Sequence, residues 1–134
     1  MILETSFLVD VLKGRPDAAA LVEELDRTQA SLYIPTPALF ELWLGAGKAV
    51  KRREETEKIA ALVDSYDLAL FSDDDAREAG LLQARLSGSG RGMNTVDVML
   101  AGMARARGDT LVTSDRDFSA VRRDVKIRSY ERSG

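Results

Sequence analysis

Short apolar runs alternate with helix-type segments along the whole chain, and this alternation limits the possible folds more than any other feature. Strand-like runs lie at residues 1–3, 31–35, 68–71 and 110–113, with a weaker one at 125–128. Segments with helical character lie between them, at residues 6–13, 17–27, 36–50, 54–65, 73–86 and 95–107. Strands that alternate with helices form parallel sheets through right-handed crossovers. We therefore expect an α/β fold whose parallel sheet is covered by helices on both faces.

Several predicted helices have recognisable signals at their ends. Ser72 precedes three aspartates and suits an N-cap, because acids are favourable at a helix N-terminus. Thr36 is a candidate N-cap for the helix at 36–50, and Asn94 or Thr95 for the last helix. Gly108 follows that last helix at a position where glycine commonly ends helices.

Histidine and cysteine are both absent, which removes several classes of chemistry. Disulfides and thiol redox reactions are impossible. Mechanisms that use histidine as an acid or base are excluded, and so are zinc sites built from cysteine and histidine. A metal ion bound to this chain must have oxygen ligands, which favours Mg²⁺, Mn²⁺ or Ca²⁺.

The size and composition of the chain indicate one globular domain. Its 134 residues, 45% of them apolar, suffice for a single hydrophobic core. We expect one domain over residues 1–130 and a disordered tail at 131–134. The N-terminus does not resemble a signal peptide, and no apolar run approaches the ~20 residues of a membrane span. We therefore expect a cytoplasmic protein without a membrane partner. The net charge of −3 gives no overall basic footprint, although local patches can still bind nucleic acid.

Acidic residues follow two of the predicted strands. Glu4 comes directly after the first strand, and Asp115 and Asp117 come after the fourth. In parallel sheets, ligands bind at the carboxyl ends of the strands, so these acids should share one edge of the sheet. The simpler interpretations are a helix cap for Glu4 and a polar turn for the two aspartates.

Two further acids lie within apolar helices. Glu41 lies in the stretch 39–44, which is apolar nearly all round and is therefore expected to be buried. A buried carboxylate must be paired, protonated or bound to a metal, and an arginine partner is the alternative here. Asp97 lies in the first turn of the helix at 95–107, where a helix N-terminal acid is the alternative interpretation.

These acids are more informative together than singly. Converging carboxylates repel one another unless a cation neutralises their charge. In a chain without histidine or cysteine, Mg²⁺ or Mn²⁺ is the cation that such a group suits. Hydrolysis of a phosphodiester bond is the chemistry that such a site best supports.

The same residues make the chain similar to PIN domains, and specifically to the VapC ribonuclease toxins of toxin–antitoxin pairs. The similarity covers about residues 1–130. It rests on short motifs whose order and spacing are specific: Leu3 to Asp10, Glu41, Asp97 with Ala101 and Ala104 behind it, and Leu111 to Phe118.

The resemblance implies a three-layer α/β/α sandwich with a four- or five-stranded parallel sheet. It implies a Mg²⁺- or Mn²⁺-dependent endoribonuclease that cuts RNA such as tRNA, rRNA or mRNA. It also implies a homodimer that a VapB-type antitoxin holds inactive.

The resemblance assigns roles to individual residues. The catalytic and metal-binding acids would be Glu4, Glu41, Asp97 and Asp115, with Asp117 nearby and the choice between the last two open. The groups that support these acids would be Thr5, Ser6, Asn94 and Thr113.

One position departs from the family pattern. The family has Asp at the first acidic position, followed by Thr or Ser, whereas this chain has Glu4. The extra methylene moves the carboxylate outward, and a misplacement of about 1 Å can lower a rate on the order of 10²-fold. The alternative to an active nuclease is therefore a weakened PIN domain that binds RNA or an antitoxin.

Basic residues supply candidate RNA contacts, with ordinary surface charge as the alternative for each. The candidates are Lys48, Lys51, Arg52 and Arg53 after the Glu41 helix, Arg91 in a glycine-rich loop, and Arg116. A receiver-like phosphoacceptor domain would also group acids at strand ends. That fold needs a lysine after its last strands, and none lies between Lys58 and Lys126.

Overall fold

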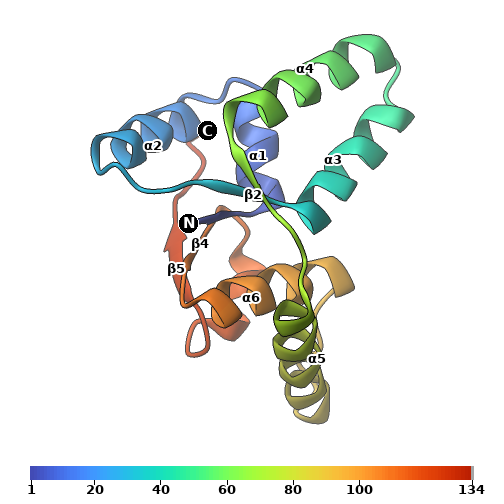
Figure 1. The fold of residues 1–134 in the computed structure, drawn as a ribbon, viewed down its shortest axis with the longest axis vertical. Helices are drawn as coiled ribbons and strands as arrows, with labels where there is room; N and C mark the ends of the chain where they lie inside the picture. Colours follow the sequence, from blue (N-terminus) through green and yellow to red (C-terminus); the bar gives the residue numbers. More distant parts are fainter. Residues whose placement is uncertain (134) are drawn as a thin grey trace.

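A five-stranded sheet forms the centre of the computed structural model, which describes residues 1–133 (Figure 1). The strands are β1 (Ile2–Leu3), β2 (Tyr33–Pro35), β3 (Asp67–Ala69), β4 (Thr110–Thr113) and β5 (Lys126–Ser129). They are all parallel and lie in the order β3-β2-β1-β4-β5. The predicted α/β fold is confirmed with five strands, because the weak run near residue 126 pairs with β4 along its whole length.

Six α-helices and one short 3₁₀ helix surround this sheet in the described residues. They are α1 (Thr5–Leu12), α2 (Pro16–Arg27), α3 (Thr36–Lys48), α4 (Arg52–Ser65), α5 (Asp73–Gly88), α6 (Thr95–Arg107) and η1 (Arg116–Val121). The α-helices lie close to the predicted segments, whereas η1 was not predicted. None of the helices within residues 1–133 combines the length and apolar character needed to cross a membrane.

Figure 1 shows α1 to α4 on one side of the sheet and α5 and α6 on the other. This division follows from the strand order. The chain moves from β1 outward to β2 and β3, then returns across the sheet to β4, and right-handed crossovers put these two paths on opposite faces. The direction reverses between β1 and β4, and such a switch point is where α/β sheets bind ligands.

The two strands at the switch point are completely buried. Ile2 and Leu3 of β1 and Leu111 and Val112 of β4 have 0% of their surface exposed. Central parallel strands are covered on both faces and therefore have continuous apolar sequences. The residues directly after β1 and β4 are therefore attached to the buried centre of the sheet.

Local capping fixes the start of α5 and α6. Ser72 Oγ accepts a hydrogen bond from the Asp75 amide (3.3 Å), and the Asp75 carboxylate accepts one from the Ser72 amide (2.8 Å). Asn94 Oδ1 accepts from the Val96 amide (3.0 Å), so Asn94 rather than Thr95 is the N-cap of α6. Gly108 ends α6 with a φ of 58°, in the left-handed region that glycine adopts easily.

Close packing joins α6 to α5. A Cβ atom at Gly102 would lie 2.6 Å from backbone and side-chain atoms of Ala79, which is too close for two carbon atoms. Glycine at this position lets the two helices approach, and this contact sets the position of the N-terminal turn of α6.

Two predictions for α3 are wrong. Thr36 is not an N-cap, because the backbone cap is Pro35 and the Thr36 hydroxyl instead accepts from the Phe71 amide (3.2 Å). The helix is also not buried all round. Phe40 is 60% exposed, Trp43 41% and Leu44 47%. An apolar surface facing outward has the same sequence pattern as one facing the core, and this caused the error.

The end of the chain was expected to be disordered from residue 131. In the described part of this segment, Arg132 donates to the buried carboxylate of Asp10 (2.8 Å), and the Ser133 amide donates to Asp17 (2.9 Å). These ion-pair and hydrogen-bond partners lie in α1 and α2, too far away in sequence for the prediction to include. Residue 134 lies outside the described residues.

Candidate metal centre

Glu4 lies at the switch point, between the end of β1 and the start of α1. Its amide donates to the Val112 carbonyl (3.0 Å), which extends the β1–β4 pairing by one residue. The side chain caps α1 by accepting from the Ser6 amide (2.8 Å), and it is 2% exposed. Glu4 therefore lies at the predicted edge of the sheet and also caps α1, which was the alternative interpretation.

Hydroxyl groups surround the Glu4 carboxylate. Ser6 Oγ and Thr113 Oγ1 both donate to its Oε1 atom. Burial raises the pKa of Glu4, the hydrogen bonds from Ser6 and Thr113 oppose that rise, and the charge of Asp115 adds to it. Both oxygens of Glu4 are thus occupied by donors of the protein itself.

Glu41 approaches the same region from α3. Its Oε1 atom accepts from Thr5 Oγ1 (2.7 Å), so the first residue of α1 holds it. Glu41 is half-buried, and the prediction of full burial is wrong for the reason given for α3. None of the ion pairs among residues 1–133 includes Glu41, so the arginine partner considered as an alternative is not found there.

Asp97 shows that the separated acids converge. It is half-buried in the first turn of α6, and its pKa is raised to about 6. Burial is the largest cause, and the negative charges of four other acids add to it: Glu4, Asp115, Glu41 and Asp117. The fold therefore brings the other four predicted acids within electrostatic reach of Asp97.

Asp115 and Asp117 occupy different positions at the start of η1. Asp115 is half-buried and caps η1, since its Oδ1 accepts from the Asp117 amide (2.9 Å). The Asp115 amide donates to Thr113 Oγ1 (2.9 Å), which ties it to the Glu4 cluster. Asp117 is exposed. Both raise the pKa of Asp97, but only Asp115 also raises that of Glu4, so Asp115 lies deeper in the group.

The predicted supporting residues divide into two kinds. Thr5, Ser6 and Thr113 bind the acidic side chains directly. Asn94 instead caps the helix that carries Asp97, so it acts through the backbone.

Sequence reasoning missed two supporting residues, Ser114 and Asp10. The Ser114 amide donates to Ser6 Oγ (3.2 Å), and its hydroxyl lies 3.1 Å from Ser6 Oγ and 3.5 Å from the Asp10 carboxylate. Asp10 is 1% exposed and also accepts from the Tyr130 hydroxyl (2.7 Å). The sequence does contain an indication of this pairing, because Ser6 and Asp10 are four residues apart and therefore lie on the same side of a helix that is apolar from Phe7 to Val9.

The donor chemistry fits a hard divalent cation. Carboxylates and hydroxyls are the groups that Mg²⁺ and Mn²⁺ bind, and a cation would relieve the repulsion that raises the pKa of Asp97. Within residues 1–133, no three acidic side chains are already placed so that they could hold one ion together. Glu4 and Glu41 are turned toward hydroxyl donors, so binding a metal would require side-chain rotations.

Two of the predicted basic residues lie beside these acids. Arg91 and Arg116 line a cavity of about 400 Å³ together with Asp97 and Asp117. The other cluster lies around the α3–α4 junction: Lys48 ends α3, Lys51 precedes α4, and Arg52 and Arg53 begin α4.

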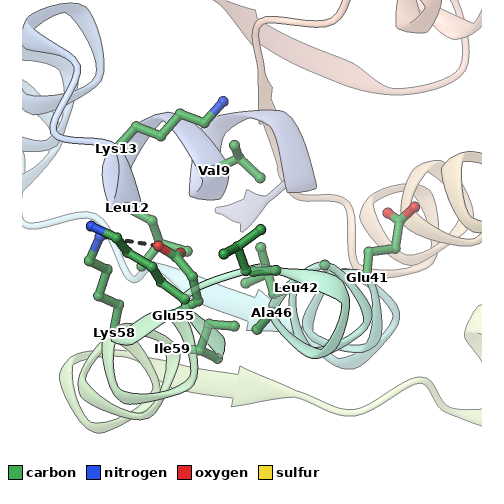
Figure 2. Close-up of a pocket in the computed structure, with 13 residues that line it drawn as sticks. Val9, Leu12, Lys13, Glu41, Leu42, Ala46, Glu55, Lys58 and Ile59 are labelled. Atoms are coloured by element: carbon green, nitrogen blue, oxygen red, sulfur yellow. Dashed lines mark hydrogen bonds and ion pairs between the residues drawn. The ribbon is translucent and has the colours of Figure 1, made fainter. Parts of the chain in front are cut away.

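An apolar groove of about 560 Å³ lies between α1, α3 and α4. Figure 2 shows Val9 and Leu12 of α1 facing Leu42 and Ala46 of α3, with Ile59 of α4 beside them. Charged residues also line the groove: Lys13, Glu55, Lys58 and Lys51. Glu41 lies at one end, so the groove adjoins the acidic site.

Comparison with known proteins gives consistent matches over most of the chain. The sequence profile described as PIN domain matches residues 1–124. The tRNA(fMet)-specific endonuclease VapC of Shigella flexneri is 30% identical over 120 residues, which are 89% of each chain. Ribonuclease VapC19 of Mycobacterium tuberculosis is 31% identical over 118 residues, 87% of this chain and 90% of its own. Among solved structures, VapBC2 from Rickettsia felis bound to a DNA fragment from its promoter superposes with a TM-score of 0.87 and 22% identity, covering 97% of this chain and 98% of the other.

Proposed function

The chain belongs to the PIN domain family as a VapC-type member, and from this premise we propose that it is a Mg²⁺- or Mn²⁺-dependent endoribonuclease that acts as the toxin of a toxin–antitoxin pair. The observation that carries the proposal is the grouping of acids from separate segments around Asp97, close enough that their negative charges help to raise its pKa. A divalent cation bound there supplies a Lewis acid for hydrolysis of a phosphodiester bond.

The residues of the site have separate tasks in this proposal. Glu4, Glu41, Asp97 and Asp115 hold the cation, with Asp117 at the exposed edge. Thr5, Ser6 and Thr113 orient the carboxylates through the hydrogen bonds described above. Arg91 and Arg116 bind substrate phosphates, since guanidinium groups form paired hydrogen bonds to phosphate oxygens.

The proposed partners follow from two apolar surfaces. The groove between α1, α3 and α4 is open and apolar, which suits a segment of a VapB-type antitoxin. The exposed side chains Phe40, Trp43 and Leu44 on α3 suit contact with a second copy of the chain, because exposed apolar patches mark interaction surfaces. The structures of VapBC complexes that resemble this chain support the antitoxin assignment.

One observation favours a second candidate function. The Glu4 carboxylate already accepts three hydrogen bonds within the protein. If these bonds outcompete the metal, the chain is a weakened PIN domain that still binds RNA or its antitoxin.

A cleavage assay separates the two functions. The purified protein is incubated with total tRNA in Mn²⁺, in Mg²⁺ and in EDTA, beside an Asp97→Asn variant. The nuclease proposal expects fragments that depend on the metal and are lost in the variant. RNA binding without cleavage in either metal would support the binding module, and cleavage that persists in EDTA would contradict the metal mechanism.

A further inference from the structure

The exposed face around η1 carries more positive charge than the motifs indicated. Next to the cavity that contains Asp97 and Arg91 is a second cavity of about 580 Å³, lined by Arg85, Arg91, Arg122 and Arg123. The two cavities share Arg91 together with Ser119 and Ala120 of η1. A continuous basic path therefore runs from the end of α5, across η1, to the acidic site.

The arginines of this path are largely free to bind an external anion. Asp124 is the one acid that lines the second cavity, and Arg85 (2.6 Å) and Arg105 (2.7 Å) neutralise it. Among residues 1–133, the side chains of Arg91, Arg116, Arg122 and Arg123 form no ion pair, and all four are exposed.

The basic cluster at the α3–α4 junction has several acidic residues directly beside it. Arg53 is paired with Glu57 (3.3 Å), and Lys58 with Glu55 (3.3 Å). Glu54 and Glu55 lie in the first turn of α4, directly after Arg52 and Arg53. Of the four residues of this cluster, only Arg53 forms an ion pair among residues 1–133, but acids lie directly beside the cluster in α4. The cluster also adjoins an apolar groove rather than the cavity that contains Asp97.

We propose that an RNA strand approaches the site along η1, with its phosphates on Arg122, Arg123 and Arg91 before the strand reaches Asp97. This inference rests on the proposed ribonuclease function and names the surface that holds its substrate. A chain of phosphates fits this path better than an acidic protein segment does. The path leads directly into the proposed metal site, where the reaction needs a phosphodiester together with a cation, whereas an acidic protein segment would have no function there.

The test compares two matched double variants, Arg122→Gln/Arg123→Gln and Arg52→Gln/Arg53→Gln. Each removes two exposed charges, and thermal melting verifies that each is folded. Binding to fluorescein-labelled tRNA is measured by anisotropy in EDTA over a series of KCl concentrations. The first variant should bind more weakly and reduce the slope of log K against log[salt] by about 0.7 for each lost phosphate contact, as for single-stranded nucleic acid. The second should match the wild type.

The possible outcomes distinguish failure of the proposed RNA path from failure of the proposed nuclease function. If the wild type cleaves RNA but the Arg122/Arg123 variant keeps its affinity and slope, the path is wrong and the nuclease proposal stands. A larger loss in the Arg52/Arg53 variant would move the RNA to the α3–α4 side and overturn the path. Loss of antitoxin binding without loss of RNA binding in the Arg122/Arg123 variant would assign the surface to a protein and also overturn it. A wild type that neither binds nor cleaves RNA would overturn both proposals.

Discussion

At the scale of single residues, Glu4 has a structural role and a proposed metal-binding role, and both use the same two oxygen atoms. It caps α1 through the Ser6 amide, and it accepts from the Ser6 and Thr113 hydroxyls. A metal ion needs the same lone pairs. The longer side chain of glutamate reaches across to Thr113 on β4, and a shorter side chain at this position would reach less far toward that strand.

A Glu4→Asp variant should therefore be the more active enzyme. Aspartate is at least as good an N-cap as glutamate is here, so α1 should remain capped. We expect tighter Mn²⁺ binding and cleavage of tRNA that is about tenfold faster or more, given the sensitivity of catalysis to displacements of about 1 Å. Calorimetric titration and a gel assay would measure the two effects. Glu4→Gln is the control that keeps the length and removes the charge, and an aspartate variant without any gain would refute the explanation.

Asp97 should make the stability of the metal-free protein depend on pH. Its pKa is about 6 in the folded protein against an ordinary value of 3.8, so the folded state binds more protons between these values. Stability should therefore fall as the pH rises through this window. Asp97→Asn should raise the free energy of unfolding by about 1–2 kcal/mol at pH 8 and by less at pH 5. This value allows for solvent screening, because Asp97 is only half-buried. Urea titrations in EDTA at the two pH values measure this, and an equal effect at both would contradict it.

At the scale of secondary-structure elements, the contact between α5 and α6 positions Asp97. Gly102→Ala would place a methyl group 2.6 Å from Ala79 atoms. Overpacking of this kind costs about 1–3 kcal/mol, and we expect a corresponding loss of stability in urea. The matched control is Gly80→Ala on α5, where nothing lies within 4 Å of the new Cβ. That change should stabilise the helix by about 0.5–1 kcal/mol, and destabilisation by both variants would contradict this explanation.

The exposed apolar side of α3 should control self-association. Trp43 and Leu44 are 41% and 47% exposed, and burial of such side chains in a dimer contributes about 25 cal/mol per Å² of apolar surface. We expect light scattering to give a dimer mass for the wild type and a monomer mass for Trp43→Arg. Val50→Arg is the control, because Val50 is fully exposed in the loop after α3. A monomeric wild type would contradict the assignment.

At the scale of the whole molecule, metal binding should stabilise the fold, because the proposed ligands come from elements on both faces of the sheet. A ligand that binds only the folded state adds about 2.7 kcal/mol at a concentration of 100 times its dissociation constant. Mn²⁺ should therefore raise the melting temperature of the wild type reversibly, with EDTA restoring the original value. The gain should be much smaller for Asp97→Asn, and equal gains in the two proteins would place the ion elsewhere.

The sequence was sufficient for the architecture and the acidic motifs, because both depend on local patterns. Buried strands such as β4 have continuous apolar sequences, and N-caps such as Ser72 act over three residues. Local patterns do not show contacts between distant segments. An outward apolar face on α3 has the same pattern as a buried one, and the bond from Arg132 to Asp10 spans 122 residues. The arginines after η1 were not among the predicted RNA contacts, because the cavity that they line is formed by two separate segments and is not visible in the sequence.

The attachment of the chain end to Asp10 has a consequence for genetic experiments. Arg132 and Tyr130 hold Asp10, Ser114 lies between Asp10 and Ser6, and Ser6 holds the Glu4 carboxylate. For a protein whose expression arrests growth, as we propose, surviving colonies would carry inactivating alleles at the codons for Tyr130 and Arg132 as well as at those for the acids. A mutant library restricted to the acidic motifs would leave out these inherited determinants of the site.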